Sequence, residues 1–142
     1  MTEQLIDEIL STAKTIAIVG ISNKPERDSY KVAEYLQKHG YKIVAVNPQQ
    51  EGNLILGEVC YPNLQIAQQH SHAKIDIVDC FRKSADIPAI VDEAIAVKAG
   101  AVWMQLSIVN EQAAEIAQQA GLRVVMDRCT KIEHKRMHNI TE

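Results

Sequence analysis

Cysteine is scarce in this sequence of 142 residues, which contains only three. Cys60, Cys80 and Cys129 are odd in number and none stands in a Cys-x-x-Cys spacing, which excludes a disulfide-rich scaffold and a cysteine-rich zinc site. The histidines offer no substitute, because His70 and His72 lie two residues apart in a polar turn with no third ligand nearby. The sequence therefore predicts no metal site.

Aromatic residues and excess charge are scarce as well. Aromatics make up 4% of the chain, and 15 Lys and Arg residues stand against 18 Asp and Glu, a net charge of −3. Nucleic-acid binding draws on a basic field and on aromatic side chains that stack on bases. The composition therefore argues against a nucleic-acid partner, although it leaves open a basic patch confined to a pocket.

Long apolar runs are missing too. Every apolar stretch is interrupted well before the about 18 residues that a membrane span needs, and the start Met1-Thr2-Glu3-Gln4 lacks the basic and apolar segments of a signal peptide. We therefore expect no membrane contact and a cytoplasmic location. With 46% hydrophobic and 23% charged residues, the chain is expected to form one globular domain over residues 1–142.

Short runs rich in β-branched residues alternate with segments of helical periodicity. Most of the runs are continuously apolar, as in parallel strands covered on both faces; they lie at residues 15–19, 42–46, 75–79, 101–104 and 123–126. The clearest helical segments lie at residues 29–39, 84–98 and 110–120, with weaker ones at 62–69 and at both ends of the chain. This alternation predicts an α/β fold, a three-layer Rossmann-like parallel sheet of about five strands in the order 3-2-1-4-5. One extra short strand is expected around Val59.

The loop after the first strand is the best candidate for a binding site. It joins a buried strand to a helix N-terminus, where free backbone N–H groups and the helix dipole favour an anion such as phosphate. Ligands of such sheets bind beside the carboxyl end of strand 1. The alternative is a tight turn with a helix cap at Asp28 or Ser29 and solvated basic side chains. The loop begins at Gly20, and its candidate donors are Ser22, Lys24, Arg27 and Ser29.

The fingerprint of dinucleotide binding is incomplete. It requires three glycines in this loop and an acidic residue at the end of the second strand, whereas the loop has Gly20 alone and the strand ends in Val46-Asn47-Pro48. NAD is therefore disfavoured, and no P-loop motif occurs. Asn47 is a candidate to bond an adenine or ribose edge, with Pro48 fixing the backbone against it. A strand-terminating turn is the alternative.

The next strand ends supply further candidates. Phe81, the only phenylalanine, suits either a flat ligand or the core. Arg82 is placed either to meet a phosphate or to stay solvated. Gln105 and Ser107, after the strand at 101–104, offer neutral hydrogen bonds and no general acid or base.

Together these stretches resemble the stand-alone CoA-binding proteins, relatives of the CoA-binding Rossmann domain at the N-terminus of succinyl-CoA ligase alpha subunits. The resemblance covers about residues 5 to 137, and the combination of motifs is specific although each is weak alone. The matching residues are Val19 to Ser22, Pro25, Arg27, Ser29, Val46 to Pro48, Phe81-Arg82, Trp103 to Gln105, Asn110-Glu111, Asp127 to Cys129 and Glu133-His134.

The resemblance implies a role for several segments. The loop from Gly20 through Ile21 to Ser22 would hold the CoA pyrophosphate, and Val46-Asn47-Pro48 with Phe81 would lie along the adenosine. Met104, Gln105 and Leu106 would lie near the pantetheine path. Family members often carry Gly at the position of Ser107, whose side chain would narrow the channel if pantetheine passed close by. The ligase relatives bear a phosphorylated histidine on a second domain that this chain does not contain, so ligase activity is not carried over.

The resulting hypothesis is non-catalytic binding of coenzyme A or an acyl-CoA, with no catalytic residue assigned. One alternative is an NAD(P)-type oxidoreductase that uses Asp79 or Cys80 in the same crevice. Another is a CoA-thiol redox protein in which Cys80 or Cys129 forms a mixed disulfide with CoA. A docking module for a separate catalytic chain and a homo-oligomer remain open. The predicted CoA-contacting residues are Gly20, Ile21, Ser22, Lys24, Arg27, Ser29, Val46, Asn47, Pro48, Phe81, Arg82, Met104, Gln105 and Leu106.

Overall fold

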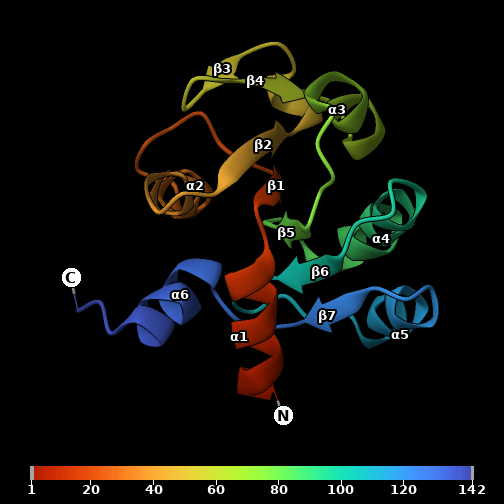
Figure 1. Ribbon diagram of the computed structural model, residues 1–142. Helices are drawn as coiled ribbons and strands as arrows, with labels where there is room; N and C mark the ends of the chain where they lie inside the picture. Colours follow the sequence, from red (N-terminus) through yellow and green to blue (C-terminus); the bar gives the residue numbers. More distant parts are fainter. Residues whose placement is uncertain (1, 142) are drawn as a thin grey trace.

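The computed structural model describes residues 2–141 (Figure 1). The strands are β1 (Thr15–Val19), β2 (Lys42–Val46), β3 (Leu54–Ile55), β4 (Glu58–Tyr61), β5 (Ile77–Cys80), β6 (Ala101–Met104) and β7 (Arg123–Val125). The helices are α1 (Thr2–Thr12), α2 (Asp28–Lys38), α3 (Leu64–Ser71), α4 (Ile87–Ala96), α5 (Glu111–Gln119) and α6 (Thr130–His138). Two short 3₁₀ turns cover Pro48–Gln50 and Ser84–Asp86.

All seven strands belong to one sheet, in the order β3-β4-β2-β1-β5-β6-β7, and only β3 runs antiparallel to its neighbour. The Rossmann-like α/β class is confirmed. The 3-2-1-4-5 order is also confirmed when the short strand around Val59 is counted as strand 3, because the parallel strands run β4-β2-β1-β5-β6, with β7 beyond β6. The expected number of about five strands is too low. The extra short strand around Val59 exists as β4, and the missed β3 is only two residues long. So short a segment carries no readable periodicity.

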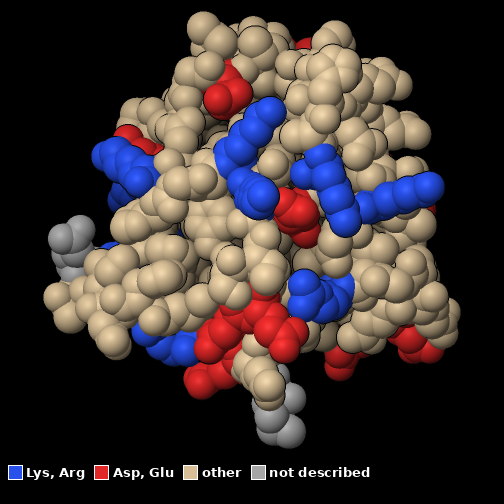
Figure 2. All heavy atoms as spheres, viewed as in Figure 1, with Lys and Arg blue, Asp and Glu red and all other residues tan. Residues whose placement is uncertain are grey.

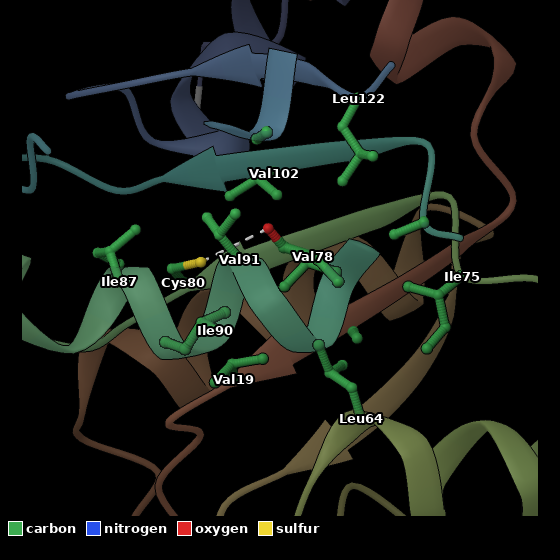
Figure 3. Packing of buried hydrophobic residues seen from close by; sticks show 14 of the residues in the cluster. Val19, Leu64, Ile75, Val78, Cys80, Ile87, Ile90, Val91, Val102 and Leu122 are labelled. Atoms are coloured by element: carbon green, nitrogen blue, oxygen red, sulfur yellow. Dashed lines mark hydrogen bonds between the residues drawn. The ribbon is translucent and has the colours of Figure 1, made fainter. Parts of the chain in front are cut away.

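Helices cover both faces of the sheet, with α1, α2 and α6 on one side and α3, α4 and α5 on the other (Figure 1). Successive side chains of each strand point to opposite faces of the sheet and pack into two separate hydrophobic cores. Figure 3 shows Val78 and Cys80 of β5 packed against Ile90 of α4, whereas Ile18 and Trp103 belong to the core beneath α1 and α2. Because both faces are buried, the central strands are apolar at almost every position.

The helix ends agree with the sequence patterns in part. The expected helix over 110–120 is α5, and Asn110 caps it, since the Asn110 side-chain oxygen accepts the N–H of Ala113 at 3.0 Å. The expected helix over 84–98 begins later, because Ser84 opens a 3₁₀ turn, and its hydroxyl oxygen accepts the N–H of Val109 at 3.2 Å. Ser84 therefore joins the turn after β5 to the loop after β6.

Ion pairs connect α1 to distant parts of the chain. Asp7 pairs with Arg136 of α6 at 2.6 Å, and Glu8 pairs with Arg123 of β7 at 3.3 Å. Figure 2 shows acidic atoms gathered over α1, with basic atoms beside them. Exposed pairs of this kind each contribute little to the free energy of unfolding. Across residues 2–141, no helix combines the length and the apolar character that crossing a bilayer requires.

Candidate functional site

The carboxyl ends of the central strands lie level with one another. Val19 of β1 is paired with Val46 of β2 and with Cys80 of β5, and Cys80 is paired with Met104 of β6. The segments that follow these strands therefore converge at one edge of the sheet. The helix after β1 crosses one face and the helix after β5 crosses the other, which opens a crevice between the two strands.

Three hollows meet in this crevice and share residues. The first, here called the polar hollow, has a volume of about 580 Å³. Its charged side chains balance, because Lys24 and Arg27 are offset by Glu26 and Asp28. Besides the two basic side chains, the amide N–H groups in the first turn of α2, which has no side-chain cap, favour an anion here. It is lined by Gly20, Ser22, Asn23, Lys24, Glu26, Arg27, Asp28, Ser29, Asn47, Gln49, Gln50 and Phe81.

Hydrogen bonds hold the loop of the polar hollow in shape. The N–H of Gly20 donates to the carbonyl of Val46 at 2.8 Å. The N–H of Ser22 donates to the Ser29 hydroxyl at 2.9 Å, so Ser29 braces the loop and neither it nor Asp28 caps α2, whose cap position is Arg27. The loop is thus arranged before any ligand arrives.

Gly20 occupies a place that only glycine fits. Its φ is +89°, and a Cβ there would lie 2.7 Å from the carbonyl oxygen of Phe81 and 2.8 Å from Cδ of Arg82. The backbones after β1 and β5 touch at this point, and any side chain would push them apart.

Asn47 is an anchor of the same loop. Its side-chain nitrogen donates to the carbonyl of Ile21 at 2.9 Å, and its side-chain oxygen accepts the N–H of Gln49 at 2.9 Å. The side chain is buried. These bonds favour the strand-terminating turn over recognition of an adenine edge.

The second space, the apolar hollow, has a volume of about 560 Å³ and adjoins the polar hollow at Phe81. Leu106 and Ile132, each 53% exposed, line it. Large apolar side chains exposed around one concave surface are typical of ligand sites. The lining residues are Asp28, Lys31, Val32, Phe81, Arg82, Lys83, Gln105, Leu106, Ile108, Cys129, Lys131 and Ile132.

The third space, the outer cleft, has a volume of about 340 Å³ and lies toward α4. Arg82 borders both this cleft and the apolar hollow, and its Nε lies 3.3 Å from a carboxylate oxygen of Asp86. The outer cleft is lined by Val19, Gly20, Val46, Pro48, Pro62, Arg82, Ala85, Asp86, Ala89, Ile90 and Glu93.

The structure brings all but two of the residues expected to contact CoA to the rims of these hollows. Ile21 and Met104 are fully buried and line none of them. Ile21 packs in the core beneath α2, and strand alternation turns Met104 into the core beneath α4 and α5. The side chains of Ile21 and Met104 thus point away from the hollows, and contact of CoA with the backbone of these two residues stays a prediction.

Sequence reasoning missed one wall of the apolar hollow. Lys31 and Val32 come from α2, and Lys131 and Ile132 come from α6. Helical periodicity marks the buried face of a helix and says nothing of which partner it meets. The charged segment near the C-terminus indicates a helix that folds over the sheet. No local signal showed that this helix lines the apolar hollow.

The cysteines do not fit a redox role. Cys80 is fully buried and points into the core beneath α4, with Sγ 3.7 Å from the carbonyl of Val78 (Figure 3). Burial, with the charge of Asp79 as a smaller cause, raises the pKa of the Cys80 thiol well above its ordinary value. Burial also raises the pKa of Cys129, which borders the apolar hollow. Both thiols therefore stay protonated and poorly nucleophilic.

Ser107 lines none of the three hollows, so its side chain narrows none of them. It adopts φ +68°, and its N–H donates to the carboxylate of Asp127 at 2.7 Å. Glycine is favoured at such a position for its backbone conformation.

A doubly wound parallel sheet with adjoining polar and apolar hollows at its switch point has the architecture of Rossmann-like ligand-binding proteins. The family described as CoA binding domain matches residues 14–135, and the chain belongs to that family.

Similar proteins agree in sequence and fold. The protein YneT of Bacillus subtilis is 36% identical over 129 residues, which cover 91% of each chain. A hypothetical protein from Pyrococcus horikoshii is 40% identical with a TM-score of 0.88, covering 97% of this chain and 93% of that one. A Thermus thermophilus protein is 34% identical with a TM-score of 0.86, covering 96% and 99%.

A more distant structure shares only the fold. The dinucleotide-forming acetyl-coenzyme A synthetase of Ca. Korarchaeum cryptofilum is 20% identical with a TM-score of 0.67. The match covers 82% of this chain and 26% of the synthetase. The fold of this chain therefore recurs as one part of a larger enzyme.

Proposed function

We propose that this protein binds coenzyme A or an acyl-CoA across the crevice, without chemistry of its own. The CoA phosphates occupy the polar hollow, the adenosine lies along Val46, Pro48 and Phe81, and the pantetheine arm enters the apolar hollow. The observation that carries this proposal is the direct adjacency of the polar and apolar hollows at Phe81, in a member of the CoA-binding family. CoA is divided in the same way, because its nucleotide half carries the charged phosphates and its pantetheine half is uncharged.

The polar hollow suits phosphate because its donors are fixed. The Ser22–Ser29 and Gly20–Val46 hydrogen bonds hold the loop in shape, so the loop loses little conformational entropy when a ligand binds. Amide N–H groups at the start of α2 supply hydrogen bonds and a positive dipole end. Lys24 and Arg27 add charge where the phosphates enter.

The apolar hollow suits pantetheine, a flexible chain with two amide groups and no charge. Leu106 and Ile132 supply apolar surface, and the side chain of Gln105 supplies a neutral polar group. The lysines of this hollow lie on α2 and α6 and after β5, at the rim of the site.

Two features support binding without catalysis. The second strand ends at Asn47, whose amide is bonded to the backbone, so no acidic residue there holds the ribose of a nicotinamide cofactor. The thiols at this edge are buried, with raised pKa values. Neither alternative, oxidoreductase or CoA-thiol redox protein, gains an observation in its favour.

Thermal-shift titration of charge variants tests the proposal. Lys24→Gln and Arg27→Gln are expected to weaken CoA binding about 3- to 10-fold each, the effect of losing a hydrogen bond to a charged group in a partly screened site. Lys74→Gln, an exposed lysine before β5, is the matched control and is expected to bind as the wild type does. Equal CoA affinity in all three variants would contradict the placement of the phosphates. Dephospho-CoA tests separately whether the 3′-phosphate is held.

A further inference from the structure

A fully buried carboxyl group lies at the carboxyl end of β5, behind the apolar hollow. Asp79 has no exposed surface. One of its oxygens accepts from Nε2 of Gln105 at 2.5 Å, and the other accepts from the hydroxyl of Thr130 at 2.8 Å. Nε2 of Gln105 also donates to the Thr130 oxygen at 3.0 Å. Three elements, β5, the segment after β6 and the start of α6, thus close one ring of hydrogen bonds.

Packing alone does not explain a buried carboxyl group at this position. A buried carboxylate without a basic partner is costly, and apolar side chains of similar volume would fill the same space without that cost. Burial raises the pKa of Asp79 to about 7, although the bonds from Gln105 and Thr130 oppose the shift. The ring therefore suggests a role outside the core, and Gln105 is its only member that lines a hollow.

The ring fixes which end of the Gln105 amide faces the hollow. Above pH 7 the carboxyl group of Asp79 is ionised and only accepts hydrogen bonds, so it takes the N–H of Gln105 and the O–H of Thr130. Thr130 has then donated its one proton, and its oxygen accepts from Gln105. Nε2 donates both hydrogen bonds of the Gln105 amide, so these bonds leave the amide oxygen without a partner. Among residues 2–141, no buried side-chain oxygen or nitrogen lacks a partner, so this oxygen is not buried. The amide oxygen of Gln105 is therefore the end in contact with the hollow.

We propose that Asp79 and Thr130 are positioning residues that hold the oxygen of the Gln105 amide toward the apolar hollow, where it accepts a hydrogen bond from a pantetheine amide N–H. The inference rests on the proposed function, because it assigns the pantetheine arm to that hollow. The expected consequence is selectivity for a ligand that presents an N–H donor to the Gln105 oxygen in the apolar hollow.

The test compares two ligands and a matched pair of variants by calorimetric titration. CoA contains the pantetheine arm, and adenosine 3′,5′-bisphosphate contains the nucleotide without it. Thr130→Val keeps the shape of the side chain and removes the hydroxyl, whereas Thr130→Ser keeps the hydroxyl. Asp79→Asn is a second disruption, because an asparagine also donates and no longer fixes the orientation of Gln105.

We expect Thr130→Val and Asp79→Asn to weaken CoA binding about 3- to 10-fold, the effect of one hydrogen bond. Their affinity for adenosine 3′,5′-bisphosphate stays at the wild-type value, and Thr130→Ser restores the CoA affinity. Unchanged CoA binding in both disrupting variants would overturn the inference, and so would equal weakening of both ligands, which marks a structural role. A wild type that binds no CoA would instead refute the proposed function itself.

Discussion

At the scale of single residues, the crevice depends on how closely the backbone after β1 approaches the backbone after β5. Gly20 combines a positive φ with a distance of 2.7 Å from its Cβ position to the carbonyl oxygen of Phe81. A side chain at position 20 would therefore cause both backbone strain, from the positive φ, and a clash with the Phe81 carbonyl. The loop that borders the polar hollow cannot keep its shape if the residue acquires a side chain.

Replacing Gly20 with alanine tests this account. We expect Gly20→Ala to lower the free energy of unfolding by about 2–5 kcal/mol, the sum of backbone strain and overpacking, and to weaken CoA binding. Gly40→Ala is the control, because Gly40 has φ +97° and no atom within 4 Å of its Cβ position. It should cost only the strain, about 1–2 kcal/mol. Denaturant unfolding measures both, and equal losses would contradict the close approach.

At the scale of elements, α6 closes over α2 through a cluster of aromatic rings. Nδ1 of His134 lies 2.8 Å from the hydroxyl of Tyr35, and the His134 ring lies within 5.1 Å of His39 and 4.3 Å of His138. Burial, followed by the neighbouring His138 and His39, lowers the pKa of His134 to about 4. Between pH 6.5 and about 4, the His134 ring therefore stays neutral in the folded protein, whereas it takes up a proton in the unfolded chain.

The lowered pKa makes stability depend on pH. The unfolded chain binds the proton near pH 6.5 and the folded chain only near 4, so the contribution is present above pH 6.5 and is lost as the pH falls toward 4. The loss amounts to at most roughly 3 kcal/mol. His134→Gln should lack this slope in urea unfolding between pH 4 and 7. A variant with the same slope as the wild type would contradict the assignment to His134.

The elements could be predicted from the sequence where burial left a pattern. Continuous apolar runs predicted the parallel strands, because those strands are covered on both faces. The pattern failed at β3, which is two residues long. It also failed at Asp79, Gln105 and Thr130, since a ring of hydrogen bonds between three distant segments leaves no periodic trace. The loop at Gly20 was predictable because its position after the first strand is set by topology alone.

At the scale of the whole molecule, the site is assembled from segments far apart in the chain. The loop at residues 20–29, the turn at 81–84, the segment at 105–108 and the start of α6 at 129–132 border the two larger hollows. Only the level ends of the parallel strands and the return of α6 bring them together. One bound molecule should therefore affect all four segments at once.

Hydrogen exchange can detect this joint effect. With saturating CoA we expect slower amide exchange in residues 20–29, 81–84, 105–108 and 129–132, because binding restricts local opening. Residues 40–42, at the opposite end of the sheet, should exchange as in the free protein. Protection confined to the first segment would contradict the assignment of the pantetheine arm to the apolar hollow.

Calorimetric titration of the wild-type protein with CoA measures whether this chain binds coenzyme A. We expect saturable binding of one CoA per chain and much weaker binding of NAD, because Asn47 at the end of β2 is no acidic partner for the NAD ribose. At a free CoA concentration 100 times the dissociation constant, the free energy of unfolding should rise by about 2.7 kcal/mol. No heat of binding with CoA, or tighter binding of NAD, would contradict the account.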